Sequence, residues 1–101
     1  MKMLMMIFKE SLEEEIQELL SKHHVSAFTQ MNDVTGMGEG GASMHSLSFP
    51  GFNNMILAGL PEPDADKVVD ALKAYRERLI KKQGNTKIPL RVFSLPCEMV
   101  V

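Results

Sequence analysis

The first half of the chain joins short apolar segments to one amphipathic segment. An apolar run bounded by charge spans Lys2–Phe8, which is too short for a helix and favours a buried strand. Isoleucine and leucines then recur at helical spacing, with glutamates and a glutamine between them. This pattern predicts a helix over Leu12–His23, begun by Ser11 and Glu14 at the spacing of a capping box. Val25–Met31 is typical of a second strand.

The second half repeats this alternation. The apolar segment Asn54–Leu60 predicts a third strand. The prolines and acids of Pro61–Asp66 are typical of a helix start, and the apolar positions that follow keep a 3.6-residue period. Basic residues crowd the end of this helix, and Gly84 is its predicted stop. Two more strands are predicted, over Ile88–Leu95 and Cys97–Val101.

The element order is therefore βαββαβ with one extra strand at the end. Two split βαβ units predict an α+β, ferredoxin-like fold, in which an antiparallel sheet carries both helices on one face. We expect residues 1–101 to form a single domain of this kind.

The two strands expected at the centre of this sheet are apolar on both faces. Alternation places Met3, Met5 and Ile7 on one face of the first strand. Leu4, Met6 and Phe8 fall on the other face, and the third strand behaves alike. Because the helices cover one face only, the second would expose a large apolar patch. A closed assembly of copies would bury it. The alternative is a methionine-rich monomer with a partly wet sheet face.

Charge and composition limit the kinds of partner and the cellular location that we expect. The formal net charge is −2 and no basic stripe occurs, so duplex nucleic acid is not an expected partner. The longest apolar run, Met3–Phe8, has six residues, whereas a bilayer span needs roughly 20. We therefore expect neither membrane insertion nor a signal peptide. The one cysteine, Cys97, cannot form a disulfide within the chain, which fits a cytoplasmic location.

A glycine-rich loop over residues 34–54 separates the second and third strands. It holds five of the seven glycines: Gly36, Gly38, Gly40, Gly41 and Gly51. Glycines allow positive φ and close backbone approach, so backbone N–H groups of such a loop can point at an anion. A long loop on a rigid scaffold is also a common place for function.

With its element order, the chain resembles the PII signalling proteins, the nitrogen regulatory proteins P-II, and especially their short PII-like relatives. "TGMGEGGA" (Thr35–Ala42) stands where PII proteins have G-F-G-R-Q-K-G before their T-loop. Gly36 and Gly38 match the first two glycines of that motif. "KKQGNTKIPLRVFSL" (Lys81–Leu95) corresponds to the B-loop and fourth strand of the family. The resemblance covers almost the whole chain.

This resemblance implies a non-enzymatic, cytoplasmic signal-transduction regulator. PII proteins are homotrimers that bind adenine nucleotides in three clefts between subunits. Their T-loop changes shape to contact a target protein, and for this chain a membrane transporter, an efflux pump or a metabolic enzyme is the implied partner. The short T-loop would cover about residues 34–54.

The departures from the family restrict the ligand. Gly40 and Gly41 stand where PII proteins have a Gln and a Lys, and the C-terminal arginines that neutralise phosphates have no counterpart. Triphosphate binding is therefore not expected, while ADP, AMP, a cyclic nucleotide or another small anion remains compatible. The candidate ligand contacts are Gly36, Gly38, Gly40, Gly41, Lys87 and Arg91.

The second half of the loop carries the candidates for a partner or a metal. Met44, His45, Phe49 and Phe52 are the candidate partner contacts, although the two phenylalanines could equally fold back over the cleft. Methionine, histidine and cysteine suit soft metals, so His45 and Cys97 are candidate metal ligands. This leaves an alternative function, a metal-responsive trimer of the CutA or efflux-associated type. No nucleophile–base pairing is legible, so no enzyme is predicted.

Overall fold

The computed structural model describes residues 1–36 and 53–101. Within them the predicted order of strands and helices holds, with a short 3-10 helix (η1) before the first α-helix. The elements are β1 (Lys2–Lys9), η1 (Glu10–Leu12), α1 (Glu13–Lys22), β2 (Thr29–Val34), β3 (Asn53–Leu60), α2 (Glu62–Gln83) and β4 (Leu90–Pro96).

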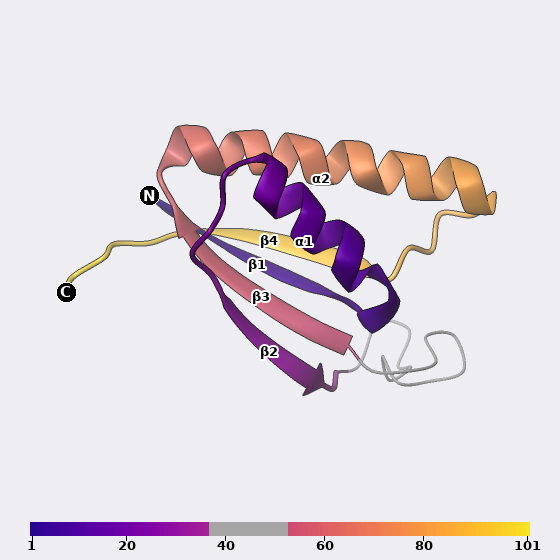
Figure 1. Ribbon diagram of the computed structural model, residues 1–101, viewed down its shortest axis with the longest axis horizontal. Helices are drawn as coiled ribbons and strands as arrows, with labels where there is room; N and C mark the ends of the chain where they lie inside the picture. The colour runs from indigo at the N-terminus through magenta and orange to yellow at the C-terminus, as the bar shows by residue number, and fades with distance from the viewer. Residues whose placement is uncertain (37–52) are drawn as a thin grey trace.

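The strands form one antiparallel sheet in the order β2-β3-β1-β4. Both α-helices lie on the same face of this sheet, and α2 runs along its whole length (Figure 1). The predicted α+β, ferredoxin-like fold is confirmed, and β1 and β3 are the central strands as expected.

The core fills the space between the sheet and the helices. Alternate residues of the central strands point into it, and Leu4, Met6 and Phe8 of β1 are completely buried. The helices contribute their apolar stripes, with Ile16 and Leu20 of α1 fully buried. Val68, Leu72, Tyr75 and Leu79 of α2 complete this layer.

The predicted fifth strand over Cys97–Val101 is wrong. The Cys97 N–H donates to the carbonyl of Met1 at 3.2 Å, at the very start of the chain. The residues after Cys97 therefore lie past Lys2, the first residue of β1, and no strand of the described residues lies beside them. They leave the sheet as an extended tail, which Figure 1 shows projecting from the body.

The second strand lies later than predicted, at Thr29–Val34 rather than Val25–Met31. The end of α1 explains the shift. His24 adopts the left-handed conformation (φ 59°), and the Val25 N–H donates to the Leu20 carbonyl at 2.9 Å. Val25 thus closes the helix and is buried in the core.

The predicted capping box at Ser11 and Glu14 is also wrong. Ser11 lies within η1, and α1 begins after Leu12 without a side-chain cap. Leu12 is buried, so its packing draws the chain into a tight turn before the α-helix starts. The glutamates of the first turn still suit the positive end of the helix dipole.

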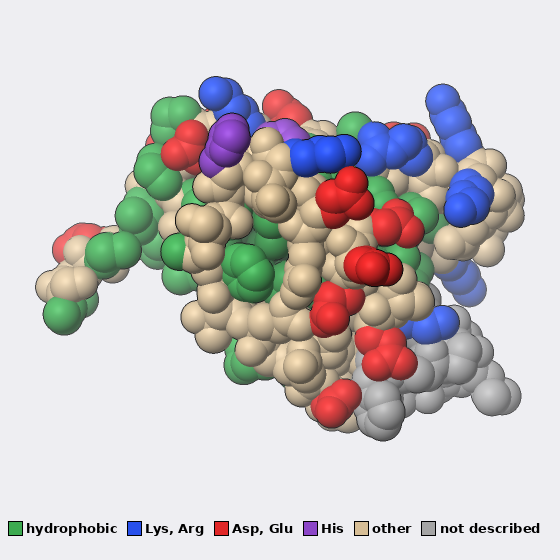
Figure 2. Space-filling model, viewed as in Figure 1, with side chains coloured by type: hydrophobic (Ala, Val, Ile, Leu, Met, Phe, Trp, Pro, Cys, Tyr) green, Lys and Arg blue, Asp and Glu red, His purple; other side chains and the backbone are tan. Residues whose placement is uncertain are grey.

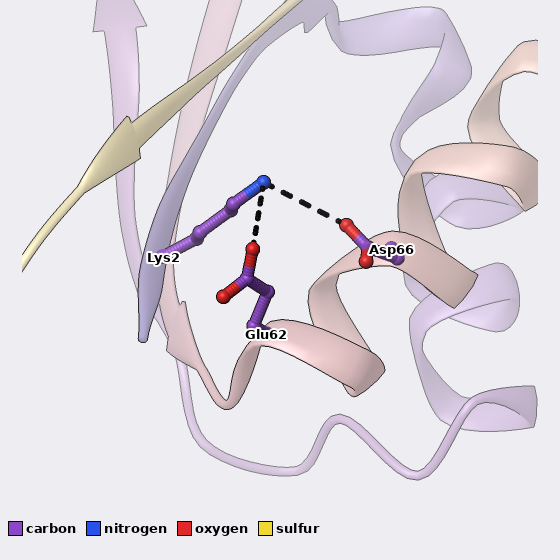
Figure 3. Close-up of polar contacts among 3 residues, drawn as sticks. All are labelled: Lys2, Glu62 and Asp66. Carbon is purple, nitrogen blue, oxygen red and sulfur yellow. Dashed lines mark ion pairs between the residues drawn. The ribbon is translucent and has the colours of Figure 1, made fainter.

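Lys2, at the start of β1, forms ion pairs with two acidic residues at the start of α2. The Lys2 Nζ lies 3.6 Å from an oxygen of Glu62 and 3.8 Å from an oxygen of Asp66 (Figure 3). Both carboxylates are well exposed, so solvent screening limits this contribution to at most about 1 kcal/mol.

Gly84 ends α2 in the left-handed conformation (φ 75°), and its N–H donates to the Ile80 carbonyl at 2.8 Å. A Cβ at Gly84 would meet no atom within 4 Å.

Gly84→Ala should lower the free energy of unfolding by about 1 kcal/mol. Because the added Cβ meets no other atom, this loss comes from backbone strain alone. Denaturant titration at equal chain concentration measures it. The control is Gly59→Ala, whose Cβ would make an ordinary 3.6 Å contact with Met3 and should not destabilise. Equal stability of Gly84→Ala and the native chain would contradict this reading.

Candidate functional site

One end of the sheet gathers both ends of the glycine-rich loop. In the strand register, Val34 pairs with Asn53, and Asn53 pairs with Lys9. The Lys9 N–H donates to the Pro89 carbonyl at 3.0 Å, so the connection from α2 to β4 arrives here too. We call this end, formed by Val34, Asn53, Lys9 and Pro89, the loop end of the sheet. Gly36 follows β2 here and is half-buried.

The strands reach further into the loop than predicted. β2 extends to Val34 and β3 begins at Asn53, so the segment between them is 35–52 rather than 34–54. Apart from Gly36, the loop residues singled out in the sequence fall outside the described residues. They are Gly38, Gly40, Gly41, Met44, His45, Phe49 and Phe52.

A polar network holds the base of the loop. β2 carries an irregularity between Met31 and Val34, where Asp33 adopts φ 57°. The buried Asn54 accepts a hydrogen bond from the Asp33 N–H at 3.2 Å. The Asn54 Nδ2 in turn donates to the Glu13 carboxylate at 2.7 Å. The strand leading into the loop is thereby tied to the first turn of α1.

Gln30 extends this network across the edge strand. Its Nε2 donates to the same oxygen of Glu13 and to the Asn32 Oδ1, and its Oε1 accepts from Gln17 at 2.9 Å. Sequence reasoning missed these residues. The signal that could have found them is a pair of asparagines heading the otherwise apolar third strand, at the edge of the glycine-rich loop.

The structure brings three of the predicted ligand contacts to the loop end. Gly36 leaves β2 there, and Lys87 lies in the connection that enters β4. The Lys87 N–H donates to the Asn85 Oδ1 at 2.6 Å, which turns this connection, while the Lys87 side chain is exposed. Arg91 is exposed on β4 and stands opposite Ile7 of β1. Lys87 and Arg91 thus lie at the β4 edge of this end of the sheet, whereas Gly36 follows β2 at the opposite edge.

The sheet face away from the helices carries apolar side chains from all four strands. We call it the open face. Its apolar members are Met31 of β2, Met55 and Leu57 of β3, Met3, Met5 and Ile7 of β1, and Phe93 and Leu95 of β4. Phe93 is 50% exposed, and Leu95 and Met31 are similarly open. The register aligns Leu57, Met5 and Phe93 in one row, so the patch is continuous.

A groove lies between the two α-helices. This groove has a volume of about 330 Å³ and is lined from α1 by Glu15, Glu18, Leu19 and Lys22, by His23, and from α2 by Ala71, Ala74, Tyr75 and Arg78. Figure 2 shows acidic side chains gathered over α1 and basic ones along α2 on this side of the molecule. None of the ligand or metal candidates lines it.

Tyr75 is the buried polar group of this groove. Its ring is 4% exposed, and its hydroxyl makes no hydrogen bond among the described residues. Burial raises the pKa of the Tyr75 phenol and the nearby Glu15 carboxylate raises it further, against the smaller opposing effect of Arg78. The phenol is therefore neutral at physiological pH. The Arg78 guanidinium lies 5.8 Å from the ring centroid, over the aromatic face.

The metal candidates are not assembled by the described part of the chain. Cys97 is a half-buried free thiol beyond β4, and His45 is not described. Residues 1–36 and 53–101 contain no cluster of three histidine, cysteine, aspartate or glutamate side chains able to hold a metal ion. Over the same residues, no helix combines the length and apolar character needed to cross a bilayer.

Comparison with known protein families identifies the family that has this architecture. The model of the family "Nitrogen regulatory protein P-II" matches residues 1–101. The chain belongs to the PII family. The predicted PII resemblance is thus confirmed over the full sequence. No curated protein sequence matches the chain significantly.

Solved structures agree on the PII fold. CPII from Thiomonas intermedia K12, a PII-like protein, superimposes with a TM-score of 0.67 in its complex with ADP, AMP and acetate. That pair is 20% identical over 92% of this chain and 81% of CPII. The apo form of CPII gives 0.66 at 18% identity, over 93% and 85%. The complex with ADP and bicarbonate gives 0.63 at 19%, over 93% and 84%.

Tyr75→Phe tests the unpaired hydroxyl between the helices. It should keep or raise the free energy of unfolding, by up to about 1 kcal/mol, because it removes a buried polar group without a partner. The pKa of Tyr75 is higher in the folded chain than the ordinary 10.0. The stability linked to this group is therefore complete below pH 10 and is lost as the pH rises through the folded value. Between about pH 9 and about pH 11, the native chain should lose more stability than Tyr75→Phe. Parallel losses would contradict the burial of the phenol.

Proposed function

We propose that this PII-family protein is a non-enzymatic, trimeric regulator that binds a small anionic effector between subunits. It signals to a partner protein through the loop between β2 and β3. The observation that carries the proposal is the open face, which is apolar over four strands and sits next to the loop end.

The open face supports assembly with copies of the same chain. Leu57, Met5 and Phe93 form a continuous row, and a patch of this kind is rare on soluble monomers. Burying apolar surface stabilises an interface by roughly 25 cal/mol per Å². PII proteins close three copies around such a face, and cyclic closure leaves no open end.

The effector is an anion carried by a small molecule. CPII, which shares the fold, has been solved with ADP and AMP together with acetate, and with ADP and bicarbonate. At the loop end of this chain, Lys87 and Arg91 are exposed cations on the β4 side of the sheet, and Gly36 lies on the β2 side. The loss of the Gln and Lys at Gly40 and Gly41 favours a mono- or diphosphate, or a carboxylate-like anion, over a triphosphate.

The loop is the element that would meet the partner. Its base is fixed by the bond from Asn54 to Glu13, so ligand-dependent movement would be confined to the segment beyond it. A membrane transporter or an efflux pump reached from the cytoplasm is the partner class that the PII relationship favours.

Phe93→Glu tests the assembly. Phe93 is 50% exposed and lies on the edge strand β4, opposite Met5 in the row of the open face that also holds Leu57. A charge buried there without a counter-charge should separate the copies. By light scattering, the native mass should be about three times 11.3 kDa, falling towards 11.3 kDa in the variant.

Ser94→Glu is the matched control, because it adds the same charge to the same strand on the helix side, opposite Leu4. It should leave the mass unchanged. A native chain of 11.3 kDa, or a Phe93→Glu chain with native mass, would overturn the proposed assembly.

A thermal-shift panel tests the effector. ADP, AMP, bicarbonate and 2-oxoglutarate are added separately to the native chain, with Cu and Zn salts in parallel. A ligand at 100 times its Kd adds about 2.7 kcal/mol to stability, so an adenine nucleotide or bicarbonate should raise Tm by several degrees. A response to metal alone, abolished by His45→Ala, would favour the metal-responsive alternative instead.

A further inference from the structure

The groove between α1 and α2 has a buried hydroxyl in its lining. Tyr75 is 4% exposed, and its Oη makes no hydrogen bond to any described residue. A buried hydroxyl without a partner is costly and uncommon in folded proteins. The Arg78 guanidinium lies over the Tyr75 ring, 5.8 Å from its centroid, and helps to hold the ring in place. The hydroxyl is therefore a positioned polar group that lacks a partner.

Glu15 shows which way this hydroxyl points. Tyr75 belongs to α2 and Glu15 to α1, and both line the groove. The Glu15 carboxylate lies close enough to raise the pKa of the phenol, although the two groups do not reach hydrogen-bonding geometry. The hydroxyl thus faces α1 across the groove. Because Glu15 is exposed, its side chain is free to turn and admit a ligand to the hydroxyl.

Two charges of the groove are left without a partner. Glu18 and Lys22 pair with each other at 3.7 Å, so their charges cancel. Among the described residues, neither Glu15 nor Arg78 forms an ion pair. One carboxylate and one guanidinium, both beside Tyr75, therefore remain for a ligand. A ligand with a single charge would match only one of them.

The rest of the lining is mostly small and apolar. Leu19 of α1 and Ala71 and Ala74 of α2 supply this surface. The His23 Nδ1 donates to the Leu19 carbonyl at 3.0 Å, so this nitrogen is already occupied. The groove volume of about 330 Å³ lies at the lower end of the roughly 300–1,000 Å³ typical of small-molecule sites. The groove therefore suits a small molecule with a short apolar part.

We propose that this groove binds a small zwitterion of the amino-acid class, which carries an ammonium group, a carboxylate and an apolar side chain. Glu15 accepts hydrogen bonds from the ammonium, and the Arg78 guanidinium donates to the carboxylate. The Tyr75 hydroxyl accepts from one of these groups and donates to the other. None of the lining residues belongs to the loop end or to the open face, so the site goes beyond the proposed function.

Calorimetric titration of three probes into the native chain at about pH 6, where amines stay protonated, tests the ligand class. L-leucine carries both charges, leucine amide lacks the carboxylate and N-acetylleucine lacks the ammonium. Leucine should bind with a Kd of about 1 mM or lower. Each blocked probe should bind at least about tenfold more weakly, because a charge-assisted hydrogen bond is lost. Equal affinity for all three probes, or no binding of leucine, overturns the proposal.

Three substitutions test the residues. Tyr75→Phe, Glu15→Gln and Arg78→Gln should each weaken leucine binding at least about tenfold. Tyr75→Phe is the sharpest of them, because it removes a single oxygen and should keep the fold stable. The matched controls are Glu14→Gln on α1 and Lys73→Gln on α2, two exposed residues outside the lining, which should bind within about twofold of the native chain. Native affinity of Tyr75→Phe, or of both charge variants, overturns the proposal.

Alanine methyl signals in NMR spectra of the native chain locate the bound probe. Leucine should shift the signals of Ala71 and Ala74, which line the groove. The signal of Ala58, buried in the core on β3, is the control and should stay in place. Leucine binding that leaves Ala71 and Ala74 unshifted overturns the groove site. Because the thermal-shift panel tests the effector with other ligands, this failure would leave the proposed function standing.

Discussion

The helices cover one side of the four-stranded sheet, so the apolar side chains on its other side need a different cover. This constraint governs the molecule. The helix side closes a core around Leu4, Met6 and Phe8, all fully buried. The same strand places Met3, Met5 and Ile7 on the open face, where no described element covers them. One strand thus closes the core with one set of side chains and leaves the other set on the open face.

The same geometry sets where the glycine-rich loop begins and ends. Antiparallel pairing brings the end of β2, the start of β3 and the end of β1 to one edge, and the connection into β4 joins them. The Asn54–Glu13 bond fixes the loop base to α1, so the loop leaves from a rigid platform. Because this platform borders the open face, an effector bound at the loop end, as proposed, would lie next to both the loop and the proposed subunit interface. Binding and assembly would therefore be linked.

Periodicity predicted the order of the helices and strands, and it failed at several element boundaries and where distant residues decide. The fold order, the central strands and the Gly84 helix stop follow from spacing alone. The predicted strand over Cys97–Val101 failed because a strand needs a neighbour, and Cys97 lies opposite Met1, before the first residue of β1. The network around Asn54 was missed because its partner, Glu13, is 41 residues away. Tyr75 looked like one more apolar position of the second helix, and only the packing of α1 beside α2 sets Glu15 near its hydroxyl.

If copies of this chain cover the open face, the methionines on that face should oxidise slowly, and their oxidation rate tests this central claim directly. The chain offers Met5 and Met55 on the open face and Met99, 71% exposed, in the tail. Peroxide labelling followed by mass spectrometry should find Met5 and Met55 oxidised at least about tenfold more slowly than in the Phe93→Glu chain, with Met99 unchanged between them. Equal oxidation of Met5 and Met55 in the two chains would contradict a covered face.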